Sequence, residues 1–152
     1  MTTVVSPVAG RVTALADVPD AVFAGQLVGA GVAVEPSAPP AGGLVGVVSP
    51  IAGEIVKLHP HAFVVVDGSG TGVLVHVGID TVKLGGTGFE LAVAEGATVA
   101  AGDLVVSFDP AIVADAGYSA VVPVVVLDSA PDSVSQRAVG TTVESSAPLF
   151  DL

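Results

Sequence analysis

The stretch that decides the fold is Ala62-Phe63-Val64-Val65-Val66-Asp67-Gly68-Ser69-Gly70-Thr71-Gly72-Val73-Leu74-Val75-His76. Two valine-rich runs flank the tight-turn signal Asp67-Gly68-Ser69-Gly70. The branched valine side chain favours strands, and a turn of this type between two such runs is typical of a hairpin. The stretch therefore predicts two antiparallel strands, Phe63–Asp67 and Val73–Ile79.

Similar short runs recur along the chain and are separated by many of its 19 glycines and 11 prolines. The further runs are Leu44–Val48, Glu54–Leu58, Leu104–Phe108 and Val121–Leu127. Repeated short strands with turns between them indicate an all-β fold, here an antiparallel β-sandwich or barrel-sandwich. We expect one domain over residues 1–152.

The remaining segments predict short helical turns and surface structure. Pro110–Ala116 suits a helix with Pro110 at its first position and Asp109 as its cap. A second turn is expected at Ala21–Phe23. Ala38–Gly43 is expected to be a surface loop, and the tail Ser145–Leu152 either adds a last strand or frays.

One internal repeat is present. Ser6-Pro7-Val8-Ala9-Gly10-Arg11-Val12 recurs as Ser49-Pro50-Ile51-Ala52-Gly53-Glu54-Ile55. The simpler interpretation is a favourable turn that precedes a strand. The interpretation that we favour is a pair of equivalent turn–strand units within one β fold.

The composition excludes several classes of function. The formal net charge is −11 with only four basic residues, which argues against nucleic acid and suits a basic protein partner. The chain has no cysteine, so thiol chemistry is excluded. No uninterrupted apolar run approaches the ~20 residues of a membrane helix, and residues 1–6 do not resemble a signal peptide. A cytoplasmic location without membrane insertion is expected.

The three histidines are His59, His61 and His76. A single histidine on an apolar strand is more often a core residue than a catalyst. If Gly68-Ser69 forms a two-residue turn, however, His61 lies directly opposite His76, and opposed Cβ atoms are roughly 4.5–5.5 Å apart. A pairing shifted by one residue would leave the two histidines further apart.

Two adjacent imidazoles permit several kinds of chemistry. They can bind a metal such as zinc, one can serve as a base for the other, or one can be a nucleophile beside a hydrogen-bond donor. The chain lacks HExxH and catalytic-serine motifs, and the Gly85–Gly88 region lacks the lysine of a P-loop. Two possibilities remain for the histidine pair: phosphoryl chemistry on two histidines, or an incomplete metal site.

The run Leu74-Val75-His76-Val77-Gly78-Ile79-Asp80-Thr81-Val82 resembles the phosphorylation-site signature of the glucose-type enzyme IIA family of the bacterial phosphoenolpyruvate–sugar phosphotransferase system. Asp17–Ala24, Gly29–Pro36, Ser49–Gly53 and His61-Ala62-Phe63 also resemble this family in the expected order. The resemblance covers the chain from about Val5 to Leu127.

The resemblance implies a β-sandwich in which His76 accepts a phosphoryl group on Nε2 from the phosphohistidine of the carrier HPr. His76 then passes the group to a cysteine in the IIB domain of a sugar permease, with His61 beside the phosphoryl group. Asp20 and Asp80 match acidic positions that flank the site, and Phe23 matches an aromatic residue on the rim of the docking face. No cofactor is required in this interpretation.

Two departures and two alternatives accompany the resemblance. A threonine that often precedes the first histidine is absent, and His59 is an extra imidazole that we interpret as a surface residue. One alternative is a regulatory protein-binding module whose two histidines, His61 and His76, bind zinc together with a partner. The other is a biotinyl- or lipoyl-type carrier, indicated by Glu95–Leu104, but Lys57 and Lys83 lack the required turn setting.

Overall fold

The computed structural model describes residues 2–39 and 43–152 and consists mainly of strands. The strands are β1 (Thr3–Val5), β2 (Gly10–Ala14), β3 (Gly29–Pro36), β4 (Val45–Val48), β5 (Gly53–His59), β6 (Ala62–Val66), β7 (Gly72–His76), β8 (Phe89–Leu91), β9 (Thr98–Val99), β10 (Leu104–Phe108), β11 (Val122–Leu127), β12 (Thr142–Val143) and β13 (Pro148–Asp151). The helical elements are η1 (Leu15–Asp17), α1 (Ala21–Ala24), η2 (Thr81–Leu84) and α2 (Pro110–Asp115).

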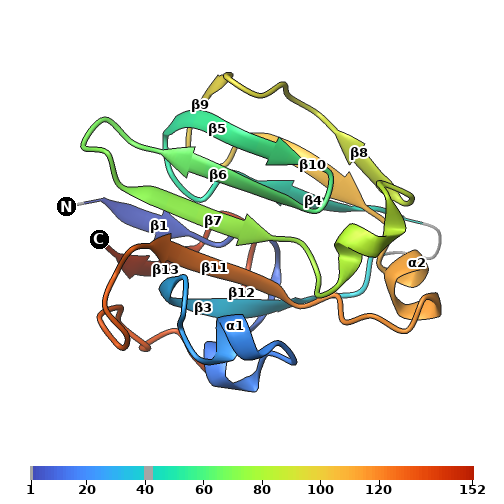
Figure 1. The fold of residues 1–152 in the computed structure, drawn as a ribbon, viewed down its shortest axis with the longest axis horizontal. Helices are drawn as coiled ribbons and strands as arrows, with labels where there is room; N and C mark the ends of the chain where they lie inside the picture. Colours follow the sequence, from blue (N-terminus) through green and yellow to red (C-terminus); the bar gives the residue numbers. More distant parts are fainter. Residues whose placement is uncertain (1, 40–42) are drawn as a thin grey trace.

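The strands form three antiparallel sheets (Figure 1). The largest has the order β12-β2-β3-β11-β7-β6-β5-β9, and behind it lie the smaller sheets β4-β10-β8 and β1-β13. Buried valines from the large sheet, such as Val12, Val65 and Val124, share one core with Val47 and Phe108 of the smaller sheets. The expected all-β antiparallel sandwich is therefore confirmed.

The Ser-Pro repeat forms two equivalent units that face each other. Ser6 and Ser49 are fully buried, and each hydroxyl donates to the carbonyl two residues onward, on Val8 and Ile51 respectively. The units also exchange backbone bonds, because Val5 N–H donates to Pro50 O and Val48 N–H donates to Pro7 O, both at 2.9 Å. The interpretation as paired turn–strand units is confirmed.

The same pseudo-twofold relation extends to the segments that follow each unit. Gly96 N–H donates to Ile55 O, and Gly140 N–H donates to Val12 O. Gly102 N–H donates to Ser49 O, and Ser146 N–H donates to Ser6 O. Residues 96–107 and 140–151 are thus equivalent, although only Gly96, Thr98 and Val99 recur, as Gly140, Thr142 and Val143.

The predicted register of the histidine hairpin is wrong by one residue. Residues 67–71 connect the strands in place of a two-residue turn, because the Asp67 carboxylate accepts from the N–H groups of Ser69 and Thr71 and widens the turn. Ala62 therefore pairs with His76. His61 lies in the β5–β6 turn, where strand alternation no longer fixes the side-chain direction.

The other expectations mostly agree with the structure. Strand β7 ends at His76, before the expected Ile79, because Gly78 has φ +80°. The helix at Pro110 is capped as expected, with Asp109 accepting from Ala111 N–H, and the tail adds strand β13. Strand β3 was not expected because glycine, alanine and proline interrupt its valines. Part of the expected loop Ala38–Gly43, residues 40–42, lies outside the described residues.

The close pairing of β3 with β11 predicts that Gly31→Ala strongly destabilises the fold. A Cβ atom at Gly31 would lie 1.9 Å from the carbonyl oxygen of Val124, so the two strands would have to separate. We expect the free energy of unfolding to fall by at least about 2 kcal/mol, measured by urea denaturation.

Gly68→Ala is the matched control, since a Cβ atom there has nothing within 4 Å. Its free energy of unfolding should change by no more than ~0.5 kcal/mol. Equal losses in the two variants would contradict the packing argument.

Candidate functional site

The backbone that follows His76 is fixed on both sides by hydrogen bonds. Val77 N–H donates to His61 O at 2.6 Å, which joins the two histidine-bearing segments directly. Gly78 N–H donates to Val121 O and Ile79 N–H donates to Ser119 O. These three N–H groups are therefore all occupied by backbone carbonyls.

Gly78 can only be glycine at this point of the chain. Its φ is +80°, and a Cβ atom would lie 2.5 Å from Thr81 Cγ2 and 2.9 Å from Ser119 O. Buried Thr81 returns a hydrogen bond from Oγ1 to Val77 O at 2.7 Å. The segment that ends β7 is thus held in one sharp turn.

The His76 ring is oriented by this turn. Its Nδ1 lies 2.5 Å from Gly78 O. A carbonyl oxygen can only accept, so Nδ1 carries the proton and donates. In the neutral ring Nε2 then has no proton, and it carries the lone pair that can act as a nucleophile.

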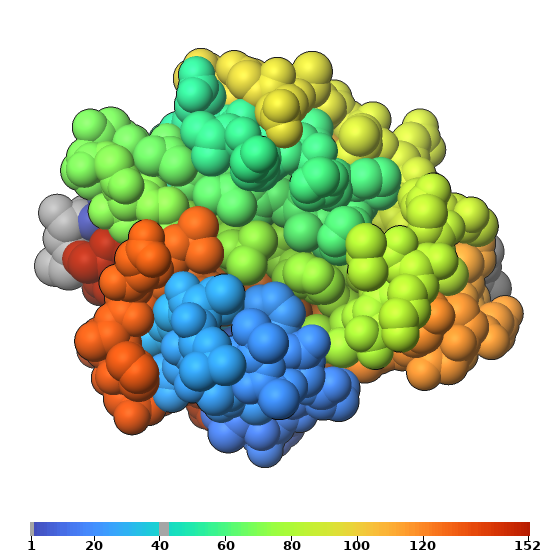
Figure 2. Space-filling model, viewed as in Figure 1, coloured from blue at the N-terminus to red at the C-terminus, as the bar shows by residue number. Residues whose placement is uncertain are grey.

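Three further rings lie around or beside His76. The His61 ring centroid is 5.3 Å from that of His76 at an interplanar angle of 70°, and the Phe23 centroid is 5.2 Å away at 59°. His59 stacks on His61 with centroids 5.6 Å apart. Despite the register error, His61 and His76 are neighbours as expected. On the face in Figure 2, the blue segment around α1 lies next to the yellow-green segment that follows β7.

Burial keeps both neighbouring imidazoles neutral. Burial lowers the pKa of His76, and the bond to Gly78 O and the carboxylates of Asp20 and Asp80 only partly oppose it. The pKa of His61 is also lowered, by burial first and then by the charges of His76 and His59. Near neutral pH the site therefore presents two uncharged imidazoles side by side.

The expected flanking residues have specific places in the structure. Asp20 caps α1, and its Oδ1 accepts from Val22 N–H at 2.8 Å and from Phe23 N–H at 3.3 Å. Asp80 is exposed and has a left-handed backbone with φ +62° just before η2. Phe23, which was expected on the rim of the docking face, is only 7% exposed. It supports the His76 ring from within because the capped helix α1 turns it inward.

Sequence reasoning missed two exposed apolar residues near the histidines. Val22 of α1 is 44% exposed and Val82 of η2 is 58% exposed. Val22 precedes the ring that packs on His76, and Val82 follows Asp80. Composition alone does not distinguish an exposed valine from the many core valines, so no signal in the sequence could have identified them.

The structure limits how a metal could bind. Among the described residues, no group of three or more His, Asp or Glu side chains is arranged to hold a metal ion. The His61–His76 pair offers two imidazoles, and zinc binding to them stays a prediction. No helix in the described part of the chain is long and apolar enough to cross a membrane.

Comparison with known proteins identifies the family. Residues 2–131 match the model for the phosphoenolpyruvate-dependent sugar phosphotransferase system, EIIA 1. Because this match spans most of the chain, the protein belongs to that family. It is thus a component of the phosphotransferase system that carries phosphoryl groups during sugar uptake.

Individual relatives agree with this assignment. The glucose-specific EIIA component of Bacillus anthracis is 41% identical over 142 residues, 92% of this chain and 82% of that protein. The glucosamine-specific EIICBA component of Bacillus subtilis is 39% identical over 134 residues, 87% of this chain but 20% of that longer protein. The solved glucose permease IIA of Mycoplasma capricolum has a TM-score of 0.83 and 30% identity, with 97% of this chain and 93% of that chain covered.

The lowered histidine pKa values predict an acid-sensitive fold. An unfolded histidine has a pKa of ~6.5, so the unfolded chain binds protons that folded His61 and His76 exclude. This contribution to stability is complete above the unfolded pKa and is lost as the pH falls through the lower folded pKa.

Urea denaturation at pH 5, 6 and 7 measures this effect. The free energy of unfolding of the wild type should fall more steeply towards pH 5 than that of the His61→Gln, His76→Gln double variant. Parallel pH profiles would contradict the assigned direction of the pKa shifts.

Proposed function

We propose that His76 accepts a phosphoryl group from the phosphohistidine of HPr and passes it to a cysteine of a sugar permease IIB domain. The observation that supports this most directly is the bond from His76 Nδ1–H to Gly78 O, which leaves the Nε2 lone pair free. In the first step Nε2 attacks phosphorus, and the donor nitrogen–phosphorus bond breaks with its electron pair returning to the donor ring. In the second step a thiolate attacks, and the pair returns to Nε2.

His61 is the group proposed to stabilise the transferred phosphoryl oxygens. Phosphoryl transfer depends on positioning and on compensation of charge more than on covalent help from the protein. The N–H groups of Val77, Gly78 and Ile79 cannot supply this help because carbonyls already occupy them. The adjacent His61 ring, 5.3 Å from His76 between centroids, can offer an N–H.

The surroundings of the pair suit the docking of a basic partner. Exposed Val22, which precedes Phe23 in α1, and exposed Val82 in η2 would provide apolar contact area. The carboxylates of Asp20 and Asp80 lie close enough to raise the pKa of His76 against the effect of burial. Combined with a net charge of −11, they would accelerate the encounter with a positively charged surface.

Labelling from radioactive phosphoenolpyruvate with enzyme I and HPr tests the roles of the two histidines. We expect one phosphoryl group per wild-type chain and none in His76→Ala, because Nε2 of His76 is lost. His61→Gln should accept the group but fail to pass it to an added IIB domain, because the imidazole proposed to contact the phosphoryl oxygens is replaced by an amide of different shape and reach.

His59→Gln provides the matched histidine control, since His59 is exposed and its ring stacks on His61. It should retain both steps of transfer. Labelling that survives in His76→Ala would overturn the assignment, and normal transfer from His61→Gln to IIB would remove the role given to His61.

A further inference from the structure

The two pseudo-equivalent halves of the molecule differ at one strand edge. Strand β10 is paired on both sides, with β4 and with β8. Its counterpart β13 pairs only with β1 within the described residues. The other edge of β13 therefore has no strand partner among the described residues, at the position where β10 receives β8.

The correspondence between the halves holds residue by residue. In one half, Val106 pairs with Val47 and Ser107 pairs with Gly46. In the other half, Phe150 pairs with Val4 and Asp151 pairs with Thr3. In both halves a register shift precedes these pairs. Ala92 N–H donates to Val105 O on the β8 side of β10. The equivalent backbone groups on Leu149, and on Asp151 two residues later, thus face the open edge.

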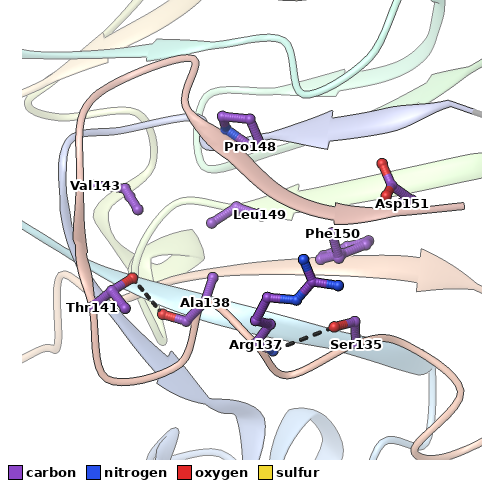
Figure 3. A pocket seen from close by; sticks show the side chains of 9 residues that line it. All are labelled: Ser135, Arg137, Ala138, Thr141, Val143, Pro148, Leu149, Phe150 and Asp151. Atoms are coloured by element: carbon purple, nitrogen blue, oxygen red, sulfur yellow. Dashed lines mark hydrogen bonds between the residues drawn. The ribbon is translucent and has the colours of Figure 1, made fainter.

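A pocket of about 380 Å³ lies along this edge (Figure 3). Its lining residues come from β12, β13 and the segment before β12: Ser135, Arg137, Ala138, Thr141, Val143, Pro148, Leu149, Phe150 and Asp151. The segment 133–135, whose numbering matches β8, is not paired with β13, and only its Ser135 lines the pocket. The lining combines apolar residues, such as Leu149 and Phe150, with the charged residues Arg137 and Asp151.

Arg137 is the basic residue of the pocket, whose lining also contains the acidic Asp151. Its backbone N–H donates to Ser135 Oγ at 3.3 Å, while its guanidinium group points towards Phe150 (Figure 3). It is one of only four basic residues in a chain of net charge −11. The nearby Asp151 carboxylate accepts from Thr3 Oγ1 at 2.8 Å, on the side of β1.

We propose that the open edge of β13 and this pocket bind an extended segment of a partner protein, which adds antiparallel to β13 and places a carboxylate against Arg137. The pairing of β8 with β10 provides an internal template for this mode. In that pair Glu90 of β8 lies opposite Ser107, the counterpart of Asp151. Main-chain bonds would supply affinity, and Arg137 would select an acidic side chain.

Charge favours a short partner segment over a second copy of this chain, because two copies of net charge −11 repel each other. The pocket also lies away from the histidines, because β13 is on the side where both termini lie and β7, which ends at His76, points away from that side (Figure 1). A partner bound here would tether the chain without covering His76, so this inference does not depend on the proposed transfer steps.

The test uses a synthetic peptide with the β8 sequence, Gly-Phe-Glu-Leu-Ala-Val-Ala, with blocked ends. Added to the isotope-labelled full chain, it should cause saturable shifts in the amide NMR signals of Thr141 and Leu149–Asp151, with none at His76. Arg137→Ala should weaken binding by about 3- to 10-fold. The same peptide with Gln in place of Glu should bind equally well to wild type and to Arg137→Ala.

Two substitutions at Asp151 separate strand pairing from other kinds of binding. Asp151→Pro removes the edge N–H at a position where proline is tolerated, and it should abolish binding while the circular dichroism spectrum stays native. Asp151→Ala keeps the N–H and removes a negative charge opposite the peptide Glu, so it should bind as tightly as wild type or more tightly. Unchanged binding by Asp151→Pro would overturn the proposal, as would a dimer of the chain in sedimentation that excludes the peptide.

Discussion

The hydrogen bond from His76 Nδ1–H to Gly78 O is the interaction on which the site depends. It forms only because the backbone reverses at Gly78, and that reversal requires a residue without a Cβ atom. The reversal in turn relies on Thr81, whose hydroxyl returns to Val77 O, and on the carbonyls of Val121 and Ser119. One ring nitrogen is consequently fixed by the end of a strand, while the lone pair of the other stays free.

The site also shows how burial and charge divide the control of one imidazole. Burial is the larger influence and lowers the pKa of His76, whereas Asp20 and Asp80 act in the opposite direction. Asp20 can do this while it caps α1, because its carboxylate is held by backbone N–H groups and stays close to the ring. The same short helix places Phe23 against His76. A four-residue element thus contributes packing and electrostatics to the site together.

Much of the fold and of the histidine pair followed from the sequence, but the geometry that joins them did not. Valine runs and turn residues located the hairpin because they act locally. The register depended on how Asp67 satisfies the N–H groups of Ser69 and Thr71, a competition between turn types that residue preferences do not decide. His61 meets His76 from a turn and not from a paired strand position. The equivalence of residues 96–107 with 140–151 was hidden because one left-handed turn position carries different residues in the two segments. Ser146 adopts φ +70° where its counterpart Gly102 has φ +93°.

The pairing of β1 with β13 places Thr3 next to Asp151, so the two ends of the described chain leave the molecule side by side (Figure 1). Within a longer polypeptide, a domain with this arrangement is attached at one point, because the chain can enter and leave it there without crossing its surface. The length of the linkers at that point would then set how far the end of the domain that carries the histidines can reach. The Bacillus subtilis relative, of which this chain spans 20%, shows that a unit of this kind does occur within a much longer protein.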